Sequence, residues 1–408
     1  MTDYITIERV YDMLADEIAP VSRTERLPLA QAEGAVLAET ISAPFDAPAF
    51  TNSAMDGFAF ASEALAAGGE VRLPVAGASY AGSRPGEALT PGTAMRIMTG
   101  APVPTGADTV IPFERTTSEG KFVVFPADRV KAGANVRLRG EEFYAGSAVI
   151  PAGTVLTPDW TGLAASLGRA ELAVRRIRVT VFATGDELAA PGTPAPLPQG
   201  RIYDANSATI GALLRKWGAE VRDLGILPDD PAAIRRALEE ALAGSDFLVA
   251  SGGLGAGEHD YTNRVLTEMG CGVTHHHVSM RPGKPFSFGR FASESERWFM
   301  ALPGNPVAAA VSASLFLRRA ILLAAGASGP LGLREVPAVA GAVLKGRTGR
   351  TDLIRGKLSI AKGALTFLPA KSQSSGMLTT LAGMNAMAVL DTLSERAEAG
   401  DAVRCLLL

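Results

Sequence analysis

Cysteine is almost absent from this chain, since Cys271 and Cys405 are the only two among 408 residues. Two cysteines cannot build a disulfide framework, and they do not have the close spacing that cysteine-ligated zinc sites use. The composition therefore excludes a disulfide-rich secreted domain. A reducing, cytoplasmic location is the expectation that follows.

The chain also lacks an excess of charge of either sign, because 39 Lys and Arg stand against 42 Asp and Glu, for a formal net charge of −3. This balance gives no general electrostatic attraction to nucleic acid or to an anionic membrane. The first residues lack the basic start and apolar core of a signal peptide, and we expect no apolar run of the about 18 residues that span a membrane. Small molecules or protein surfaces are the expected partners, with no nucleic acid and no membrane.

Two common nucleotide-binding motifs are missing, although a glycine-rich loop is present. The loop has no Walker lysine, and the spacing of Gly253, Gly255 and Gly257 does not fit G-x-G-x-x-G. A generic kinase, GTPase or dehydrogenase is therefore disfavoured. The loop follows the apolar run 247–250 and precedes a predicted helix at 261–269, so it lies at the carboxyl end of a strand, where open α/β sheets bind ligands.

The same loop carries the acids Glu258 and Asp260 beside its glycines. Glycine N–H groups approach a phosphate closely, but carboxylates beside a phosphate are unfavourable unless a cation lies between them. The pattern predicts a Mg²⁺-assisted phosphate site. A strand-to-helix turn that needs glycine only for its geometry is the alternative.

Hydrophobic periodicity divides the chain into several parts. Residues 5–18 predict an amphipathic helix, whereas short apolar runs separated by Gly and Pro between about 45 and 145 indicate a β-rich module. Strands alternate with helices from residue 177 to about 325, which predicts a parallel, doubly wound α/β sheet. Short β runs return after residue 329 and predict a small barrel or sandwich.

Further polar groups belong to the same predicted sheet edge. The strand 178–183 is followed by residues 184–188 (TGDEL), and its acids could share a Mg²⁺ with those of the glycine loop. Residues 203–207 (YDANS) precede a predicted helix on this edge. For each of these polar residues, helix capping or stabilisation of the helix dipole is the alternative.

Two cations flank a proline-rich turn downstream. Arg281 and Lys284 lie in the segment MRPGKP, and residues 302–306 (LPGNP) follow a predicted strand and open a helix. Cations beside a helix N-terminus suit a phosphate or an oxyanion, with a solvated turn as the alternative. The run 275–277 (HHH) is not expected to hold a metal, because consecutive strand residues point to opposite faces.

Seven ordered motifs in this chain resemble those of the molybdopterin molybdenumtransferase family, the molybdate-inserting enzymes of molybdenum cofactor synthesis, which are related to the gephyrin E domain. The motifs lie at residues 53–59, 98–102, 135–137 with 140–141, 184–188, 252–260, 282–285 and 302–306. The resemblance runs in order from about residue 6 to 325 and weakens in the C-terminal tail.

The resemblance implies a multidomain α/β protein with four domains. These are an elongated helical domain from two segments (1–44 plus 146–176), an inserted β-rich domain (45–145), a central doubly wound α/β molybdopterin-binding domain (177–328) and a C-terminal β-barrel (329–408). It further implies a homodimer whose cleft lies between the β-rich domain of one subunit and the α/β domain of the other. Molybdopterin adenylyltransferase and molybdoenzyme maturation proteins are further candidate partners.

The resemblance also implies a reaction, in which adenylylated molybdopterin and molybdate give molybdenum cofactor and AMP with a divalent metal, usually Mg²⁺. The family's catalytic positions match Asp56, Thr99, Glu187 and Asp260, with Asp229 or Asp230 as a further candidate. Of these, Asp56, Glu187 and Asp260 are the expected metal ligands. The expected substrate-binding residues are Ser251, Gly252, Gly253, Gly257, Asp204, Asn206, Arg281, Lys284, Pro303, Gly304 and Asn305.

Three departures from the family pattern leave alternatives open. Gly255 replaces a common serine, Glu142 a common aspartate and Arg281 a common lysine. A tungstate-preferring or catalytically weakened paralogue is one alternative, and a gephyrin-like scaffold is another. The related adenylyltransferase is a single domain, so the residues before 177 argue against it, and retention of the catalytic acids favours an enzyme over a scaffold.

Overall fold

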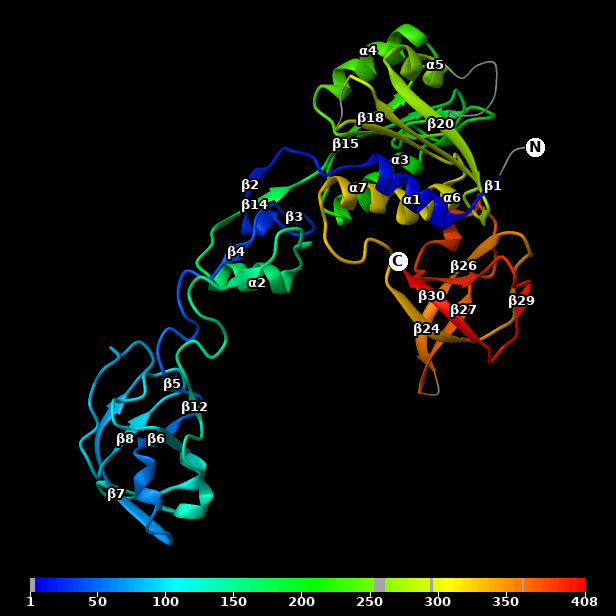
Figure 1. Cartoon of the computed structure of the whole chain (residues 1–408). Helices are drawn as coiled ribbons and strands as arrows, with labels where there is room; N and C mark the ends of the chain where they lie inside the picture. Colours follow the sequence, from blue (N-terminus) through cyan, green and yellow to red (C-terminus); the bar gives the residue numbers. More distant parts are fainter. Residues whose placement is uncertain (1–3, 253–260, 294–295, 362) are drawn as a thin grey trace. The chain divides into compact units, whose positions relative to one another are not determined.

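The computed structural model describes residues 4–252, 261–293, 296–361 and 363–408 (Figure 1). The chain divides into two compact units, of which one is Thr40–Pro151 and the other combines Met1–Glu39 with Ala152–Leu408. The boundaries of the first unit lie a few residues outside the predicted insertion at 45–145. The finer division into four domains stays a prediction.

The larger unit contains a seven-stranded sheet among its described residues, in the order β1-β20-β22-β23-β19-β15-β18. Its strands are β1 (Tyr4–Ile5), β15 (Arg178–Thr184), β18 (Glu220–Leu227), β19 (Phe247–Ser251), β20 (Cys271–Val278), β22 (Pro285–Phe291) and β23 (Trp298–Leu302). Strands β18, β15, β19 and β23 run parallel, as predicted. Strand β22 is antiparallel to both β20 and β23, so the sheet is mixed, because the short connections on either side of β22 allow only antiparallel pairing.

Helices cover both faces of this sheet, which explains why β19 and β23 are buried along their whole length. Alternate side chains of β19 serve different cores. Phe247 and Val249 join a cluster with α1 (Ile7–Glu17) and α3 (Asn206–Lys216), whereas Leu248 and Ala250 join a cluster with α4 (Pro231–Leu242) and α5 (Tyr261–Glu268).

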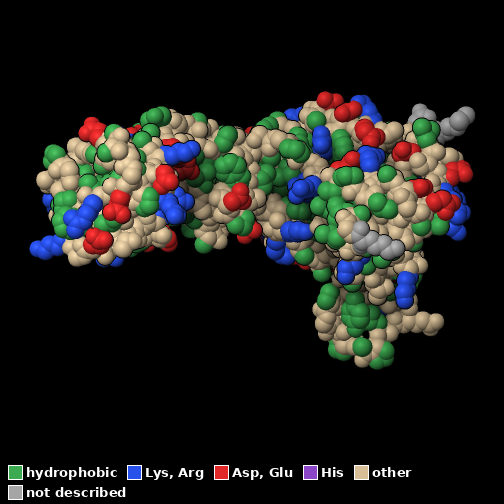
Figure 2. All heavy atoms as spheres, turned by 90° about the horizontal axis from the view of Figure 1, so that it is seen from below, with side chains coloured by type: hydrophobic (Ala, Val, Ile, Leu, Met, Phe, Trp, Pro, Cys, Tyr) green, Lys and Arg blue, Asp and Glu red, His purple; other side chains and the backbone are tan. Residues whose placement is uncertain are grey.

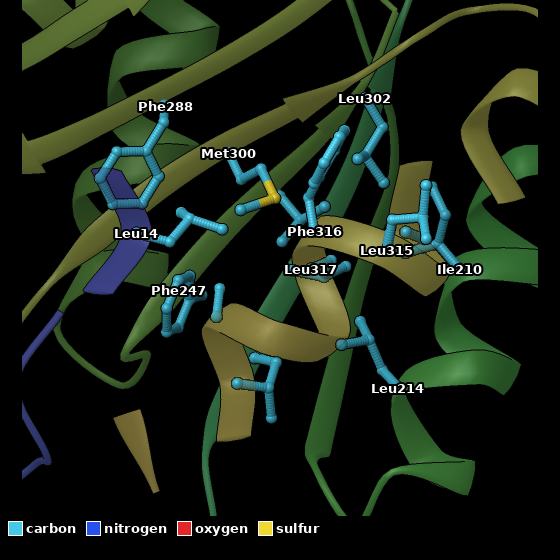
Figure 3. Packing of buried hydrophobic residues seen from close by; sticks show 14 of the residues in the cluster. Leu14, Ile210, Leu214, Phe247, Phe288, Met300, Leu302, Leu315, Phe316 and Leu317 are labelled. Atoms are coloured by element: carbon cyan, nitrogen blue, oxygen red, sulfur yellow. The ribbon is translucent and has the colours of Figure 1, made fainter. Parts of the chain in front are cut away.

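One long helix lies at the centre of the cluster that contains Phe247 and Val249. It consists of α6 (Pro306–Ser312), a π-helical turn (Ala313–Leu317) and α7 (Arg318–Ala324). Phe316 from the π-helical turn points into the cluster with Leu14 and Met300 (Figure 3). The expectation that no apolar segment reaches membrane-spanning length is wrong. By length and composition alone, the helix Pro306–Ala324 is long and apolar enough to cross a membrane. Its apolar window is 83% buried inside the protein, so the apolar character serves the core.

The C-terminal strands form a barrel within the larger unit. Strands β24 (Glu335–Ala340), β26 (Thr351–Ala361), β27 (Ala364–Pro369), β28 (Ala386–Leu390) and β30 (Ala402–Leu407) pair in a ring that closes between β26 and β28. A two-residue strand of the α/β part, β21 (Met280–Arg281), pairs with β26 and joins the barrel to the turn that carries Arg281 and Lys284.

The two segments on either side of the smaller unit also pair with each other. Strand β14 (Glu171–Arg175) lies between β2 (Glu25–Pro28) and β3 (Val36–Leu37), and α2 (Pro158–Ser166) precedes it. This pairing joins residues from before and after the inserted unit. It leaves Thr40–Pro151 as an insertion in the chain.

The smaller unit is β-rich, as predicted. Its described residues include a six-stranded sheet, in the order β10-β11-β7-β8-β6-β9. The strands are β6 (Gly57–Phe60), β7 (Glu70–Ser79), β8 (Ala94–Ile97), β9 (Thr109–Pro112), β10 (Thr117–Glu119) and β11 (Phe122–Pro126). On the visible face of Figure 2, acidic and basic side chains are interspersed, in agreement with the formal net charge of −3.

Candidate functional site

A pocket lies at the carboxyl ends of the parallel strands, and we call it the strand-edge pocket. Thr184, Ser251 and Leu302 end strands β15, β19 and β23, and the sheet register places Ser251 between Ala183 and Leu302. The cavity has a volume of about 650 Å³ and is also lined by Glu187, Leu188, Ile202, Asn206, Gly252, Pro285, Phe286, Ser287, Ala301, Pro303, Gly304, Asn305, Pro306 and Gly376. The sheet edge predicted to bind ligand is therefore hollowed.

Glu187 reaches this pocket through a tight turn after β15. Gly185 has a φ of +139°, and the Leu188 N–H donates to its carbonyl at 3.0 Å. A Cβ on Gly185 would lie 2.5 Å from Oε2 of Glu187, so only glycine lets the carboxylate fold back over the turn. The exposed Glu187 carboxylate accepts no hydrogen bond from the described residues, which leaves its oxygens available to a ligand.

Asp204 and Asn206, at the start of α3, have different contacts. Oδ1 of the buried Asp204 accepts from the N–H groups of Asn206 (2.9 Å) and Ser207 (3.1 Å), which is the geometry of a helix cap. Asn206 Nδ2 donates to the Gly304 carbonyl at 2.8 Å. The contacts of Asp204 thus match the capping alternative, whereas Asn206 fixes the turn at residues 303–305.

The glycine loop meets that turn at its described end. The Gly252 N–H donates to the Leu302 carbonyl at 3.2 Å, and a Cβ on Gly304 would lie 3.8 Å from the Gly252 Cα. The two backbones therefore run close together at the floor of the pocket. The predicted ligands Gly253, Gly257 and Asp260 lie outside the described residues, as does the departure at Gly255.

A second, larger pocket of about 1080 Å³ adjoins the first and shares Pro285, Pro303, Gly304 and Asn305 with it. We call it the cationic pocket, because Arg281 and Lys284 line it together with Arg347 and Arg350 of the barrel part. Its remaining lining residues are Tyr4, Val278, Ser279, Met280, Pro282, Gly283, Ala308, Thr348, Gly349, Ser372, Gln373, Ser374 and Ser375. No carboxylate stands among these lining residues, so the described wall is suited to an anion.

The turn that carries the predicted cations is fixed on two sides. Gly283 has a φ of +102°, and a Cβ there would approach Ser312 Oγ of α6 to 2.5 Å, so the turn packs directly on the helix. The Val278 N–H donates to the Lys284 carbonyl at 2.7 Å and closes the hairpin. On the other side, Arg281 is the register partner of Asp352 in β26.

Positive charge accumulates behind this wall. Arg355 in β26 is only 1% exposed, and its burial and the nearby Arg281 charge lower its pKa to about 10. Its Nη2 donates to the Ser374 carbonyl at 3.3 Å, while its buried Nε has no partner among the described residues. Because Arg350 is paired with Asp352 at 3.2 Å, the positive field comes mainly from Arg281, Lys284, Arg347 and Arg355.

The barrel's contribution was missed from the sequence. No recognised motif contains Arg347, Arg350 or the segment 372–375. Short basic or serine-rich loops between strands usually indicate a solvent-exposed connection. The sequence signal that could have indicated an anion-binding wall was the basic cluster KGRTGR at 345–350, in which the two arginines are three residues apart.

In the smaller unit, Asp56 and Thr99 form a pair. Oδ1 of Asp56 accepts from both the N–H and the Oγ1 hydroxyl of Thr99, each at 2.7 Å. These two hydrogen bonds, aided by the Arg96 charge, lower the pKa of the exposed Asp56 carboxyl from 3.8. The structure therefore brings these two predicted residues together and keeps Asp56 ionised.

The remaining acids show no complete metal site. Within the described ranges, no group of three or more His, Cys, Asp or Glu side chains is placed to hold a metal. Asp230 is occupied as the cap of α4, accepting from the Ala232 and Ala233 N–H groups at 3.3 and 3.1 Å. Glu187 is a hard oxygen donor of the kind that Mg²⁺ prefers, and substrate phosphate oxygens could complete such a site.

Comparison with known protein families accounts for nearly the whole chain. Residues 5–168 match the family described as MoeA N-terminal region (domain I and II), residues 180–322 match the probable molybdopterin binding domain, and residues 337–408 match the MoeA C-terminal region (domain IV). A molybdopterin molybdenumtransferase of Haemophilus influenzae is 36% identical over 404 residues, covering 98% of this chain and 97% of its own. The chain belongs to the molybdopterin molybdenumtransferase family.

Further family members agree in sequence and in fold. Molybdopterin molybdenumtransferase 2 of Mycobacterium tuberculosis is 39% identical over 323 residues, covering 77% of this chain and 78% of its own. The crystal structure of the molybdopterin biosynthesis moeA protein of Pyrococcus horikoshii OT3 covers 100% of both chains with a TM-score of 0.82 at 27% identity. The family resemblance inferred from seven motifs is confirmed, and the C-terminal barrel belongs to the family as well.

Proposed function

We propose that this protein transfers molybdenum to molybdopterin, using adenylylated molybdopterin and molybdate and releasing AMP. Membership of the family supports the reaction class. The structural observation that carries the proposal is the contact between the strand-edge pocket and the cationic pocket through residues 303–305. One substrate can thus extend from a phosphate site into an anion site.

The strand-edge pocket is the proposed site of the adenylylated phosphate. Ser251 and Gly252 bring the backbone to its floor, and the shared turn begins α6 at Pro306, where helix N–H groups favour negative charge. The Glu187 carboxylate beside them would repel a phosphate by itself. A Mg²⁺ held there by Glu187, with Asp260 and Asp56 as the further proposed ligands, would neutralise the phosphate charge and assist cleavage of its bond.

The cationic pocket is the proposed site of molybdate. This dianion needs charge-assisted hydrogen bonds, and Arg281 and Lys284 are exposed at the wall where the field of the buried Arg355 adds to theirs. Burial is the main cause of the lowered pKa of Arg355, and an anion between these groups would offset the smaller part that comes from the Arg281 charge. The arginine at 281, where the family commonly has lysine, offers two parallel N–H donors instead of one ammonium.

We further infer a cytoplasmic homodimer in which Asp56 and Thr99 of one subunit complete the site of the other. Two features support this arrangement. The Asp56 carboxylate is exposed and ionised beside Thr99. The described residues of the larger unit contain no complete acidic metal site. Both cysteines are free and buried, which suits a reducing compartment.

The test is molybdate-dependent AMP release by the purified full-length protein supplied with adenylylated molybdopterin and Mg²⁺. Lys284→Ala should raise the half-saturating molybdate concentration by about 10- to 150-fold, as expected for one charge-assisted hydrogen bond of roughly 1.5 to 3 kcal/mol. It should weaken pterin binding much less. Lys357→Ala, on the barrel and outside both pockets, is the matched control.

If Lys284→Ala weakens the binding of molybdate and of the pterin equally, Lys284 contacts the pterin or its phosphate instead. If it weakens neither, Lys284 belongs to a solvated turn without a binding role. A parallel titration with tungstate decides whether the chain prefers the other tetrahedral dianion. Absence of AMP release with either oxyanion would overturn the enzymatic proposal in favour of a scaffold.

A further inference from the structure

Lys284 is held at the rim of the cationic pocket by an aromatic ring. Its Nζ lies 4.8 Å from the centroid of the Tyr4 ring, within the range of a cation–π interaction. Among the acids of the described residues, none forms an ion pair with Lys284, so the ring is the group that restrains its charge. Tyr4 lines the same pocket and is 54% exposed.

The position of Tyr4 is fixed by the sheet. Strand β1 pairs parallel with β20, with Tyr4 opposite His277, and the Ser279 N–H donates to the Ile5 carbonyl at 2.7 Å. The His277 ring lies 5.7 Å from the Tyr4 ring, centroid to centroid, and supports its side. The Ser279 carbonyl in turn accepts from the Thr351 N–H of the barrel at 2.8 Å.

The N-terminal strand, the Lys284 turn and the barrel therefore meet at one place. The Tyr4 ring restrains the Lys284 ammonium, and the register of β1 against β20 sets the distance between the two side chains.

We propose that Tyr4 is a positioning residue that directs the Lys284 ammonium toward the anion in the cationic pocket. This inference rests on the proposed function, because it assigns Lys284 to molybdate. A lysine side chain is a flexible four-carbon stem, and holding it in the conformation that binds the anion has an entropic cost. The ring reduces that cost in advance, while the ammonium keeps donors for the oxyanion.

The expected effect is modest and specific. An exposed cation–π contact corresponds to about a two- to five-fold change in affinity. Tyr4→Leu should therefore raise the half-saturating molybdate concentration by about that factor. Tyr4→Phe keeps the ring face and should stay within about two-fold of the unmodified protein, because only the hydroxyl is lost.

A double-mutant cycle with Lys284→Ala separates positioning from a structural role. If Tyr4 acts through Lys284, Tyr4→Leu should have no further effect on molybdate binding in the Lys284→Ala background. An equal loss in both backgrounds would overturn the proposal. So would a larger effect on the pterin than on molybdate, since Tyr4 would then stack on the substrate directly. Molybdate binding measured by titration calorimetry accompanies AMP release, so that affinity is read without turnover.

The contact itself is tested independently of activity. In protein labelled with ¹³C at lysine Cε, the Lys284 resonance, assigned with Lys284→Arg, should be shifted upfield by the ring current in the unmodified protein and in Tyr4→Phe. The shift should disappear in Tyr4→Leu. Absence of the shift in the unmodified protein contradicts the positioning role even if the enzyme is active. Its presence in a protein without molybdate-dependent AMP release would reject the proposed function alone.

Discussion

At the scale of single residues, the acids predicted for the site differ in how their oxygens are used. Asp204 and Asp230 accept from N–H groups at the starts of α3 and α4 and so have structural work. The Asp56 carboxylate accepts from Thr99 alone among the described residues, and the Glu187 carboxylate accepts from none of them. Motifs identified Asp56 and Glu187, whereas Asp204 was predicted from its place before a helix and Asp230 only as an alternative to Asp229. Sequence alone could not separate these roles, because a capping acid and a metal-binding acid have the same side chain.

The pKa of Asp56 should depend on Thr99. Thr99→Val removes the hydroxyl donor but keeps the shape, so the pKa of Asp56 should rise toward 3.8. The ionised form persists to lower pH in the unmodified protein, and any stability that it contributes is lost as pH falls through the lowered folded-state pKa. Carboxyl ¹³C titration by NMR measures this directly. Thr99→Ser retains the donor and should titrate as the unmodified protein does, and an unchanged pKa in the valine variant would refute the assignment.

Glu187→Gln should severely reduce Mg²⁺-dependent AMP release and leave the fold intact. The amide has the same shape but cannot neutralise a cation, so the loss is electrostatic. Because the Glu187 carboxylate is exposed and unpaired among the described residues, the midpoint of thermal unfolding should change little. Normal turnover would exclude the catalytic role, whereas a large fall in thermal stability would support a structural one.

Both cysteines should resist alkylation in the folded protein. Burial raises the pKa of Cys271 to about 12 and that of Cys405 to about 11, which disfavours the reactive thiolate. Mass spectrometry after iodoacetamide treatment at pH 8.5 should find both unmodified, and rapid modification of both in urea. The stability from neutral Cys271 is present below its ordinary pKa of 9.0 and is lost as pH rises through the folded value. Fast labelling of native Cys271 would contradict the buried position.

At the scale of elements, the helix 306–324 forms the centre of the α/β core. Phe316 is fully buried in the cluster (Figure 3). Its ring centroid lies 5.0 Å from that of Phe286. Phe316→Ala should lower the free energy of unfolding of the larger unit by about 3 to 5 kcal/mol. Urea denaturation measures the loss. Leu393→Ala is the control, because Leu393 is 87% exposed and should change stability by less than about 0.5 kcal/mol.

Sequence pattern predicted the elements that have a single clear period. The predicted alternation of strands and helices after residue 177 agrees with α3 (Asn206–Lys216) and α4 (Pro231–Leu242), each of which lies between two strands of the sheet. The strands β20 and β22 were not predicted, because one contains three histidines and the other contains glycine and serine between its phenylalanines. They become strands through pairing with β23 and with each other, which no local pattern reveals.

At the scale of the whole molecule, the sequence identified the family and the strand-edge residues but not the barrel's share of the cationic pocket. Arg281 and Arg355 are distant in sequence and become neighbours only because β21 pairs with β26. Similarly, Asp56 was assigned through a motif, since its β-rich unit offers no chemical pattern. Its proposed place in the partner's site depends on assembly, which composition and periodicity do not address.

The most direct test of the account is complementation between two inactive variants in mixed dimers. Asp56→Asn and Glu187→Gln should each be nearly inactive alone. If the site combines Asp56 of one subunit with Glu187 of the other, each mixed dimer contains one intact site. Unfolding and refolding an equal mixture should then restore about a quarter of the unmodified molybdate-dependent AMP release, because half the dimers are mixed and each has one of two sites intact. No recovery, in a mixture shown to contain mixed dimers, would contradict the composite site.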